Sequence, residues 1–225
     1  MNIKHIHPWN VEPKKAVEYQ RKLREKISFT STYNRIKLIA GVDASYKKER
    51  IIGGIVILKY PELIILDRDF VVTKVSFPYI PGLLTFREAP ALIKLFKKIK
   101  WNPDIIFFDG QGYAHPRRMG IATHIGLFLD QSTIGCAKSR LTGEYTNPGN
   151  KKGCYSQLLD KEKVIGAVLR TRDNVKPIFV SPGNHINLSK AINITLLCTT
   201  NYRIPEPTRQ ADLFVNKIKK ELLIS

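Results

Sequence analysis

Four acidic side chains stand where this chain could place carboxylates for chemistry. Asp43 and Asp109 each follow a short apolar run. Glu88 lies in a helical pattern behind a proline-rich segment, and Asp212 lies in the last helical pattern of the chain. Carboxylate oxygens suit Mg²⁺ or Mn²⁺, which bind few protein ligands and leave positions for water and phosphate. The set favours metal-dependent phosphodiester hydrolysis, although each acid taken singly is more often a helix cap or a salt-bridge partner.

The region around Asp109 carries the clearest local pattern. Residues 105–108 are β-branched or aromatic, which is typical of a strand buried on both faces, and Asp109 follows directly. Ligands of open α/β sheets bind at such strand ends. The turn Gly110-Gln111-Gly112 lets the backbone approach a ligand closely, and Arg117-Arg118 follows it. An acid and two arginines around a glycine turn suggest a metal ion and a phosphate, and a capped strand end with a solvated turn is the alternative.

The elements that must position these acids follow from hydrophobic periodicity. Helices are predicted at residues 13–27, 84–99, 188–197 and 208–223, with a further apolar segment after residue 118 that could be a helix. Strands are predicted at residues 36–42, 51–58, 63–66, 70–75, 133–137, 163–170 and 177–180, and residues 151–160 are predicted to be irregular. Asp43 then falls at or near one strand end, and Lys138 follows another, where it could neutralise charge on a phosphate. An antiparallel run followed by βα units predicts an α/β fold, with a mixed β-sheet flanked by α-helices.

A stiff loop at residues 77–82, here called the proline loop, precedes the helix that carries Glu88. Pro78 and Pro81 each fix φ and remove a backbone donor, so they hold Tyr79 and Ile80 on a rigid, exposed segment. Farther along, Pro90 implies either a kink in the helix or a helix start near residue 89.

Charge is the strongest compositional signal. Lysine and arginine number 37 and aspartate and glutamate 19, so the formal net charge is 37 − 19 = +18, with a pI near 9.9. Self-repulsion of that size is tolerable when the partner is a polyanion. A lysine-rich surface of the thermophilic kind is the alternative, and charge alone does not separate DNA from RNA or from an anionic membrane.

Length and composition favour one catalytic domain over residues 1–225, because 225 residues with an apolar fraction of 43% can bury a sizeable core. The cysteines form no C-x-x-C pair, so neither a zinc site nor a disulfide framework is indicated. Residues 1–10 lack the apolar region of a signal peptide, and no apolar run is long enough to span a membrane. A cytoplasmic protein without a membrane partner is therefore expected.

Six motifs in order resemble the endonuclease V family, the deoxyinosine 3′ endonucleases, over nearly the whole length of the chain. They are the segments at residues 41–43 (GVD), 77–90 (FPYIPGLLTFREAP), 109–119 (DGQGYAHPRRM), 120–128 (GIATHIGLF), 134–140 (IGCAKSR) and 203–209 (RIPEPTR). The resemblance implies a ribonuclease H-like fold and Mg²⁺-dependent cleavage, with Mn²⁺ as a substitute, of DNA containing deaminated bases. The expected cut is at the second phosphodiester 3′ to inosine, leaving a 3′-hydroxyl and a 5′-phosphate, by a monomer. The alternatives are an endoribonuclease for inosine-containing RNA and a basic nucleic-acid-binding module whose acids are only structural.

The resemblance also implies roles for individual residues. Asp43, Glu88 and Asp109 fall on the family's catalytic positions, and Asp43 and Asp109 would hold the metal. Asp212 matches the fourth acidic position, where some relatives carry histidine, and Lys138 matches the active-site lysine.

The same motifs imply how a base would be taken out of a duplex. Tyr79 falls on the family's wedge residue, and Pro78, Ile80 and Pro81 complete the wedge segment. The base pocket and phosphate contacts are expected from Gly110, Gln111, Gly112, His115, Arg117, Gly120 and Ile121. For His115 a loop-capping role is an equal alternative, His124 is expected in the core, and the turn predicted at residues 181–183 either lines the base pocket or is a plain turn.

Overall fold

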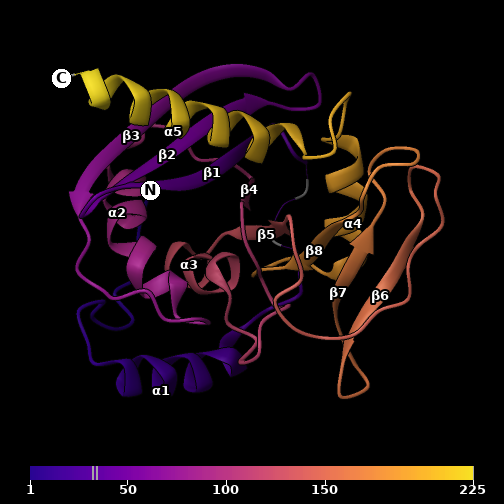
Figure 1. Cartoon of the computed structure of the whole chain (residues 1–225), viewed down its shortest axis with the longest axis horizontal. Helices are drawn as coiled ribbons and strands as arrows, with labels where there is room; N and C mark the ends of the chain where they lie inside the picture. The colour runs from indigo at the N-terminus through magenta and orange to yellow at the C-terminus, as the bar shows by residue number, and fades with distance from the viewer. Residues whose placement is uncertain (32, 34, 225) are drawn as a thin grey trace.

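The computed structural model describes residues 1–31, 33 and 35–224 and contains one eight-stranded mixed sheet (Figure 1). The strand order is β3-β2-β1-β4-β5-β8-β7-β6. The strands are β1 (Leu38–Lys47), β2 (Arg50–Lys59), β3 (Ile64–Lys74), β4 (Ile105–Phe108), β5 (Ser132–Ala137), β6 (Tyr155–Asp160), β7 (Lys163–Leu169) and β8 (Ile178–Pro182). The helices are α1 (Pro13–Leu23), α2 (Leu84–Lys98), α3 (Ile121–Leu129), α4 (Leu188–Leu197) and α5 (Glu206–Ile224), and a 3₁₀ turn, η1 (Arg24–Lys26), follows α1. None of these helices, within the described residues, is long and apolar enough to cross a membrane.

Both faces of the sheet are covered by helices, and each face has its own hydrophobic core. Alternate strand residues point to opposite faces, so Ile105 and Phe107 join the core beneath α4 and α5, whereas Ile106 and Phe108 join the core beneath α2 and α3. Burial on both faces explains why residues 105–108 are apolar without alternation. The predicted α/β fold, a mixed β-sheet flanked by α-helices, is therefore confirmed.

Asp43 does not end a strand, and this part of the prediction is wrong. The parallel pairing of β1 with β4 stops at Val42 and Phe108, but β1 continues to Lys47 because its antiparallel partner β2 continues beside it. Asp43 is thus the first residue of β1 beyond its parallel neighbour. It pairs with Gly54 on β2, and its side chain emerges level with the end of β4.

Three further predictions need correction. The strands predicted at residues 63–66 and 70–75 form the single strand β3, whose register with β2 shifts between Ile57 and Leu58. Within residues 151–160, predicted to be irregular, β6 forms the sheet edge and pairs with β7. Ser181 and Pro182 belong to the buried strand β8, so neither the pocket turn nor the plain turn is present there.

The helices largely follow the predicted periodicity. Helix α2 runs without interruption through Pro90, so the proposed start near residue 89 is wrong. Helix α4 begins after Asn187, whose side chain accepts a hydrogen bond from the Lys190 amide, as expected of an N-cap. Helix α1 ends at Leu23, and η1 completes the segment that was predicted to be helical.

A buried histidine pair joins the N-terminal segment to α3. His124 is fully buried, as predicted, and its Nε2 lies 2.7 Å from Nε2 of His7, which is also buried. Burial lowers the pKa of both rings, that of His124 well below its ordinary value. Trp9 and Phe128 pack around the pair.

Candidate active site

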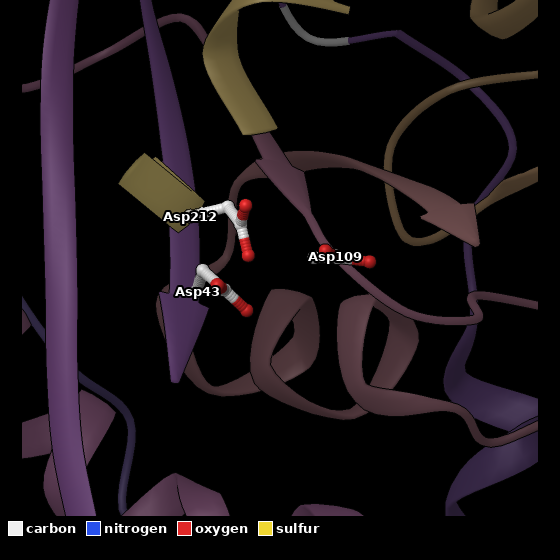
Figure 2. Close-up of side chains that lie close together, drawn as sticks. All are labelled: Asp43, Asp109 and Asp212. Atoms are coloured by element: carbon white, nitrogen blue, oxygen red, sulfur yellow. The ribbon is translucent and has the colours of Figure 1, made fainter. Parts of the chain in front are cut away.

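Three of the four acids meet beside the carboxyl end of the central strand β4. Asp43 comes from β1, Asp109 follows β4, and Asp212 comes from the second turn of α5; their side chains point toward a common space (Figure 2). One carboxylate oxygen from each lies within 4.8 Å of the other two. Carboxylates at this separation repel one another, so the arrangement needs positive charge nearby.

Two glycines let α5 come close enough to bring Asp212 to this end of the sheet. A Cβ at Gly41 would lie 1.8 Å from the carbonyl oxygen of Pro207, in the first turn of α5. A Cβ at Gly54 would lie 2.4 Å from Cγ1 of Val215, one turn beyond Asp212. Any larger residue at 41 would collide with helix backbone, so the GVD motif serves the packing of α5 as well as the placement of Asp43.

Lys138 supplies positive charge beside two of these carboxylates. Its Nζ lies 2.6 Å from Oδ2 of Asp109 and 3.6 Å from Oδ1 of Asp212. Burial and the neighbouring charge of Asp109 raise the pKa of Asp43 to about 7, and burial also raises the pKa of Asp109 in spite of its bond to Lys138. The cluster therefore holds its full negative charge at neutral pH only with cationic support beyond one lysine.

Glu88 lies apart from the three aspartates, on α2. It is 7% exposed, and its Oε1 accepts a hydrogen bond of 3.0 Å from the Tyr46 hydroxyl. Burial, with a smaller contribution from the charges of Asp43 and Asp109, raises the pKa of Glu88 to about 8, although the bond from Tyr46 opposes the rise. Glu88 is thus close enough for the charges of both aspartates to contribute to its raised pKa, which favours the protonated carboxyl group near neutral pH.

A cavity of about 380 Å³ opens beside Asp109 and Lys138. Its wall contains Tyr79, Ile80, Pro81, Gly82, Leu84, Thr85, Gly110, Gln111, His115, Gly120, Ile121, Ala137, Ser139, Arg140 and Leu141 in addition to those two residues. The proline loop forms one side, with Tyr79 72% exposed. Larger hollows of about 1060 and 860 Å³ lie elsewhere, but their walls contain none of the four acids, so chemistry rather than size singles out this cavity.

Comparison with known proteins agrees with this geometry. The family model described as Endonuclease V matches residues 21–213. An endonuclease V of Petrotoga mobilis is 46% identical over 220 residues, covering 98% of this chain and 100% of the relative. The chain belongs to the endonuclease V family. Members are metal-dependent endonucleases, and the carboxylate cluster places this chain among them.

Solved structures of the endonuclease V family share the whole fold. The crystal structure of the Bacillus subtilis protein superposes with a TM-score of 0.94 at 32% identity, covering 99% of each chain. The Ciona intestinalis endonuclease V, crystallised with a 24mer DNA containing an inosine followed by a ribo-adenosine, has a TM-score of 0.80 at 29% identity and covers 93% of this chain and 98% of its own. The fold of this chain is therefore ribonuclease H-like.

Some of the residues predicted to form the pocket make hydrogen bonds that hold its walls together. The Gly112 amide donates to Ser181 Oγ at 2.9 Å, and Gly112 does not line the cavity. Nδ1 of His115 accepts from the Arg117 amide, so Nε2 carries the proton and donates to the Gly82 carbonyl at 3.0 Å. These contacts support the loop-capping alternative for His115, although its ring also lines the cavity. Burial, with Arg117 nearby, lowers the pKa of His115 to about 4, so the ring is neutral.

The two arginines after the glycine turn are likewise engaged by protein groups. Arg117 donates to the Gly82 carbonyl and to Oε1 of Gln20. Arg118 donates to Asp160 at 2.7 Å and to the His115 carbonyl. In this arrangement both guanidinium groups hold loops together, which differs from the phosphate contacts expected of them.

Sequence reasoning missed two residues that touch the site, Tyr46 and Gln20. Alternation along β1 places Val42 and Tyr46 on the face toward α2, opposite Asp43, so Tyr46 could have been assigned to Glu88 had the strand been extended past residue 43. Gln20 occupies a position on the apolar stripe of α1, and a polar residue there is a signal for a specific buried partner.

Proposed function

We propose that this endonuclease V, acting as one catalytic domain and as a monomer, hydrolyses DNA beside a deaminated base, chiefly deoxyinosine. The cut is at the second phosphodiester 3′ to the lesion and leaves a 3′-hydroxyl and a 5′-phosphate. One observation carries the proposal: Asp109 belongs both to the carboxylate cluster and to the wall of the cavity beneath the proline loop. A base held in that cavity therefore brings its own strand to the acids.

The donor set fits a small divalent cation. Asp43, Asp109 and Asp212 offer carboxylate oxygens from three separate elements, and Mg²⁺ prefers such hard oxygen ligands, with Mn²⁺ able to replace it. When bound there, the ion would lower the pKa of an attacking water and stabilise the leaving oxygen. The raised pKa of Asp43 supports this assignment, because burial and the charge of Asp109 disfavour its carboxylate form and a bound cation would stabilise that form.

The remaining site residues have roles that follow from their contacts. Lys138 holds its ammonium group between Asp109 and Asp212, where it would meet the charge of the scissile phosphate. Glu88, oriented by Tyr46, offers a carboxyl group whose pKa of about 8 suits proton transfer near neutral pH.

The cavity suits a base that has left the stack. Enzymes that act on one base in a duplex extrude it, at a cost of a few kcal/mol, and a side chain that fills the gap offsets that cost. Tyr79 is exposed at the rim and can stack on a neighbouring base. The side chain of Gln111 lines the cavity, and its Oε1 has no hydrogen-bond partner among the described residues. Hypoxanthine has an N–H at N1, where adenine has a lone pair, so such an acceptor favours the deaminated base.

Cleavage of inosine-containing RNA is the second candidate. It is favoured by the Ciona intestinalis complex, in which the DNA carries a ribonucleotide directly after the inosine. The two functions are separated by end-labelled DNA and RNA strands of one sequence with a single inosine at a known position. We expect a Mg²⁺-dependent DNA product that ends one nucleotide 3′ to the inosine, and no product with adenosine in its place. Faster cleavage of the RNA strand would assign the ribonuclease function instead, and no product from either strand would refute the proposal.

A further inference from the structure

One main-chain oxygen at the end of the proline loop receives hydrogen bonds from three side chains. The Gly82 carbonyl accepts from Gln20 Nε2 at 3.0 Å, from His115 Nε2 at 3.0 Å and from Arg117 Nη2 at 2.7 Å. A carbonyl oxygen has two lone pairs, so three donors including a guanidinium saturate it. This anchor gathers α1, the proline loop and the segment after Asp109 around one atom.

The other end of the proline loop is fixed as well. The Phe77 ring is 3% exposed in a cluster with Ala16 and Phe86, and its carbonyl accepts from Arg87 Nη1 at 2.6 Å. Between these anchors Tyr79 is 72% exposed. A loop tied at both ends, with two prolines and one exposed aromatic ring between them, loses little freedom when that ring inserts.

Gln20 is the residue through which α1 takes part. Its side chain is fully buried and satisfied on both sides: Nε2 donates to the carbonyls of Gly82 and Met119, and Oε1 accepts from Arg117 Nε. Gln20 therefore binds the Gly82 carbonyl directly, and it also orients Arg117, which donates to the same carbonyl. Among the described residues, the hydrogen bonds of Gln20 reach the proline loop and the segment after Asp109 but none of the three aspartates, so Gln20 acts on the reaction through those two segments.

We propose that Gln20 is a positioning residue for base extrusion: it holds the proline loop so that Tyr79 enters the duplex, and Arg117 serves the same anchor. The inference rests on the proposed function. If the proline loop moved away on meeting stacked bases, Tyr79 would not insert between them and the base would stay in the stack. Loss of the anchor should therefore harm cleavage of duplex DNA, where the stack must be opened, far more than cleavage of a single strand.

The first test compares Gln20→Met, Tyr79→Ala and the double variant on one inosine-containing strand, alone and in a duplex. The readout is the ratio of kcat/KM for the duplex to kcat/KM for the single strand. We expect Gln20→Met to lower this ratio about fivefold or more, within the range that one base–aromatic stack spans. In the Tyr79→Ala background the same change should add less than about twofold, because residues acting through one another are not additive.

A matched control removes a buried hydrogen bond far from the loop. Ser132 is fully buried, and its Oγ donates to the His185 carbonyl at 2.8 Å. Ser132→Ala should lower the melting temperature yet leave the ratio unchanged. An equal drop in the ratio for Ser132→Ala would show that general destabilisation explains the Gln20 result, and a full, additive effect of Gln20→Met in the double variant would also overturn the proposal.

A second variant separates the anchor from a phosphate contact. If Arg117 met a phosphate, Arg117→Gln would reduce the slope of log K against log salt by about 0.9. The anchor predicts an unchanged slope and a lower duplex-to-single-strand ratio, and a reduced slope with an unchanged ratio would overturn it for Arg117.

Hydrogen exchange tests the anchor without any substrate. Exchange of the peptide covering residues 77–86 should be faster in Gln20→Met than in the wild type, and equal protection would refute the anchor. This readout keeps the two claims apart: a wild-type protein that cuts no inosine strand defeats the proposed function, while the exchange result still decides whether Gln20 holds the loop.

Discussion

Gly41→Ala should disable the active site without removing any of its side chains. A Cβ at residue 41 would lie 1.8 Å from the Pro207 carbonyl oxygen and 2.1 Å from the carbonyl carbon. Both are backbone atoms at the start of α5, so neither can rotate out of the way. Since a comfortable contact is about 3.5 Å, the start of α5 must move by about 1.5 Å.

That displacement is large compared with the site. The carboxylate oxygens of Asp43, Asp109 and Asp212 lie within 4.8 Å of one another, and Asp212 is carried by the helix that must move. A misplacement of about 1 Å can cost on the order of 100-fold in rate. Overpacking of this kind costs about 1–3 kcal/mol in the free energy of unfolding, which leaves most domains folded at 25 °C. We therefore expect a loss of about 100-fold in the single-turnover cleavage rate in a folded protein.

The assay is single-turnover cleavage of an inosine strand with Mg²⁺, with circular dichroism to confirm the fold. Gly149→Ala is the control, because a Cβ there meets only the Cys154 side chain, at 3.1 and 3.5 Å. Gly54→Ala should also slow cleavage, since its Cβ would lie 2.4 Å from Cγ1 of Val215, and Val215→Ala should restore part of the rate by making room. A folded Gly41→Ala protein that cleaves within about threefold of the wild type would refute this reasoning.

Other residues give sharp expectations. Asp212→His should keep measurable activity, because an imidazole can also bind a metal, whereas Asp212→Ala should lose most of the cleavage rate; equal rates for Ala and wild type would leave residue 212 without a role. Lys138→Ala should slow the single-turnover rate more than it weakens binding of the inosine strand, and an unchanged rate would exclude its place beside the phosphate. Burial lowers the pKa of His7 and of His124 in the folded state, so their contribution to stability is complete above about pH 6.5 and is lost as pH falls below that value. Melting temperatures between pH 7.5 and 5 should drop less in His124→Leu than in the wild type, and parallel curves would contradict this.

The parts of the site that could be predicted from sequence are those that depend on strand ends. Residues 105–108 and 133–137 were each predicted to be strands, with Asp109 and Lys138 directly after them. The structure pairs these strands in parallel, so both side chains leave the sheet at the same end and lie 2.6 Å apart. The last helix was also predicted, with Asp212 in it. The distance between α5 and β1 could not be predicted from any local pattern. It depends on the close contact of Gly41 with Pro207, which is far away in the sequence.

The errors share a physical cause. The first strand was predicted to end at residue 42, where the apolar run gives way to a carboxylate, but β1 continues past Asp43 because its pairing with β2 continues. Strand β6 was missed because an edge strand needs little apolar sequence when its neighbour β7 provides the pairing. The direction in which Arg117 and His115 point depends on the Gly82 carbonyl, and a side chain can be assigned to a distant main-chain atom only once the fold is known.

We propose that the cluster of Asp43, Asp109 and Asp212 performs strand cleavage beside a base that the neighbouring cavity holds. Asp109 belongs to both parts of the site, and in Asp109→Asn the amide keeps the shape of the side chain but removes its charge. Cleavage and binding of one labelled duplex with a single inosine would be measured on the same preparation. We expect the cleavage rate to fall by about 1000-fold or more while the Kd for the inosine duplex changes less than about threefold. An Asp109→Asn protein that still cleaves within about tenfold of the wild type would contradict this proposal.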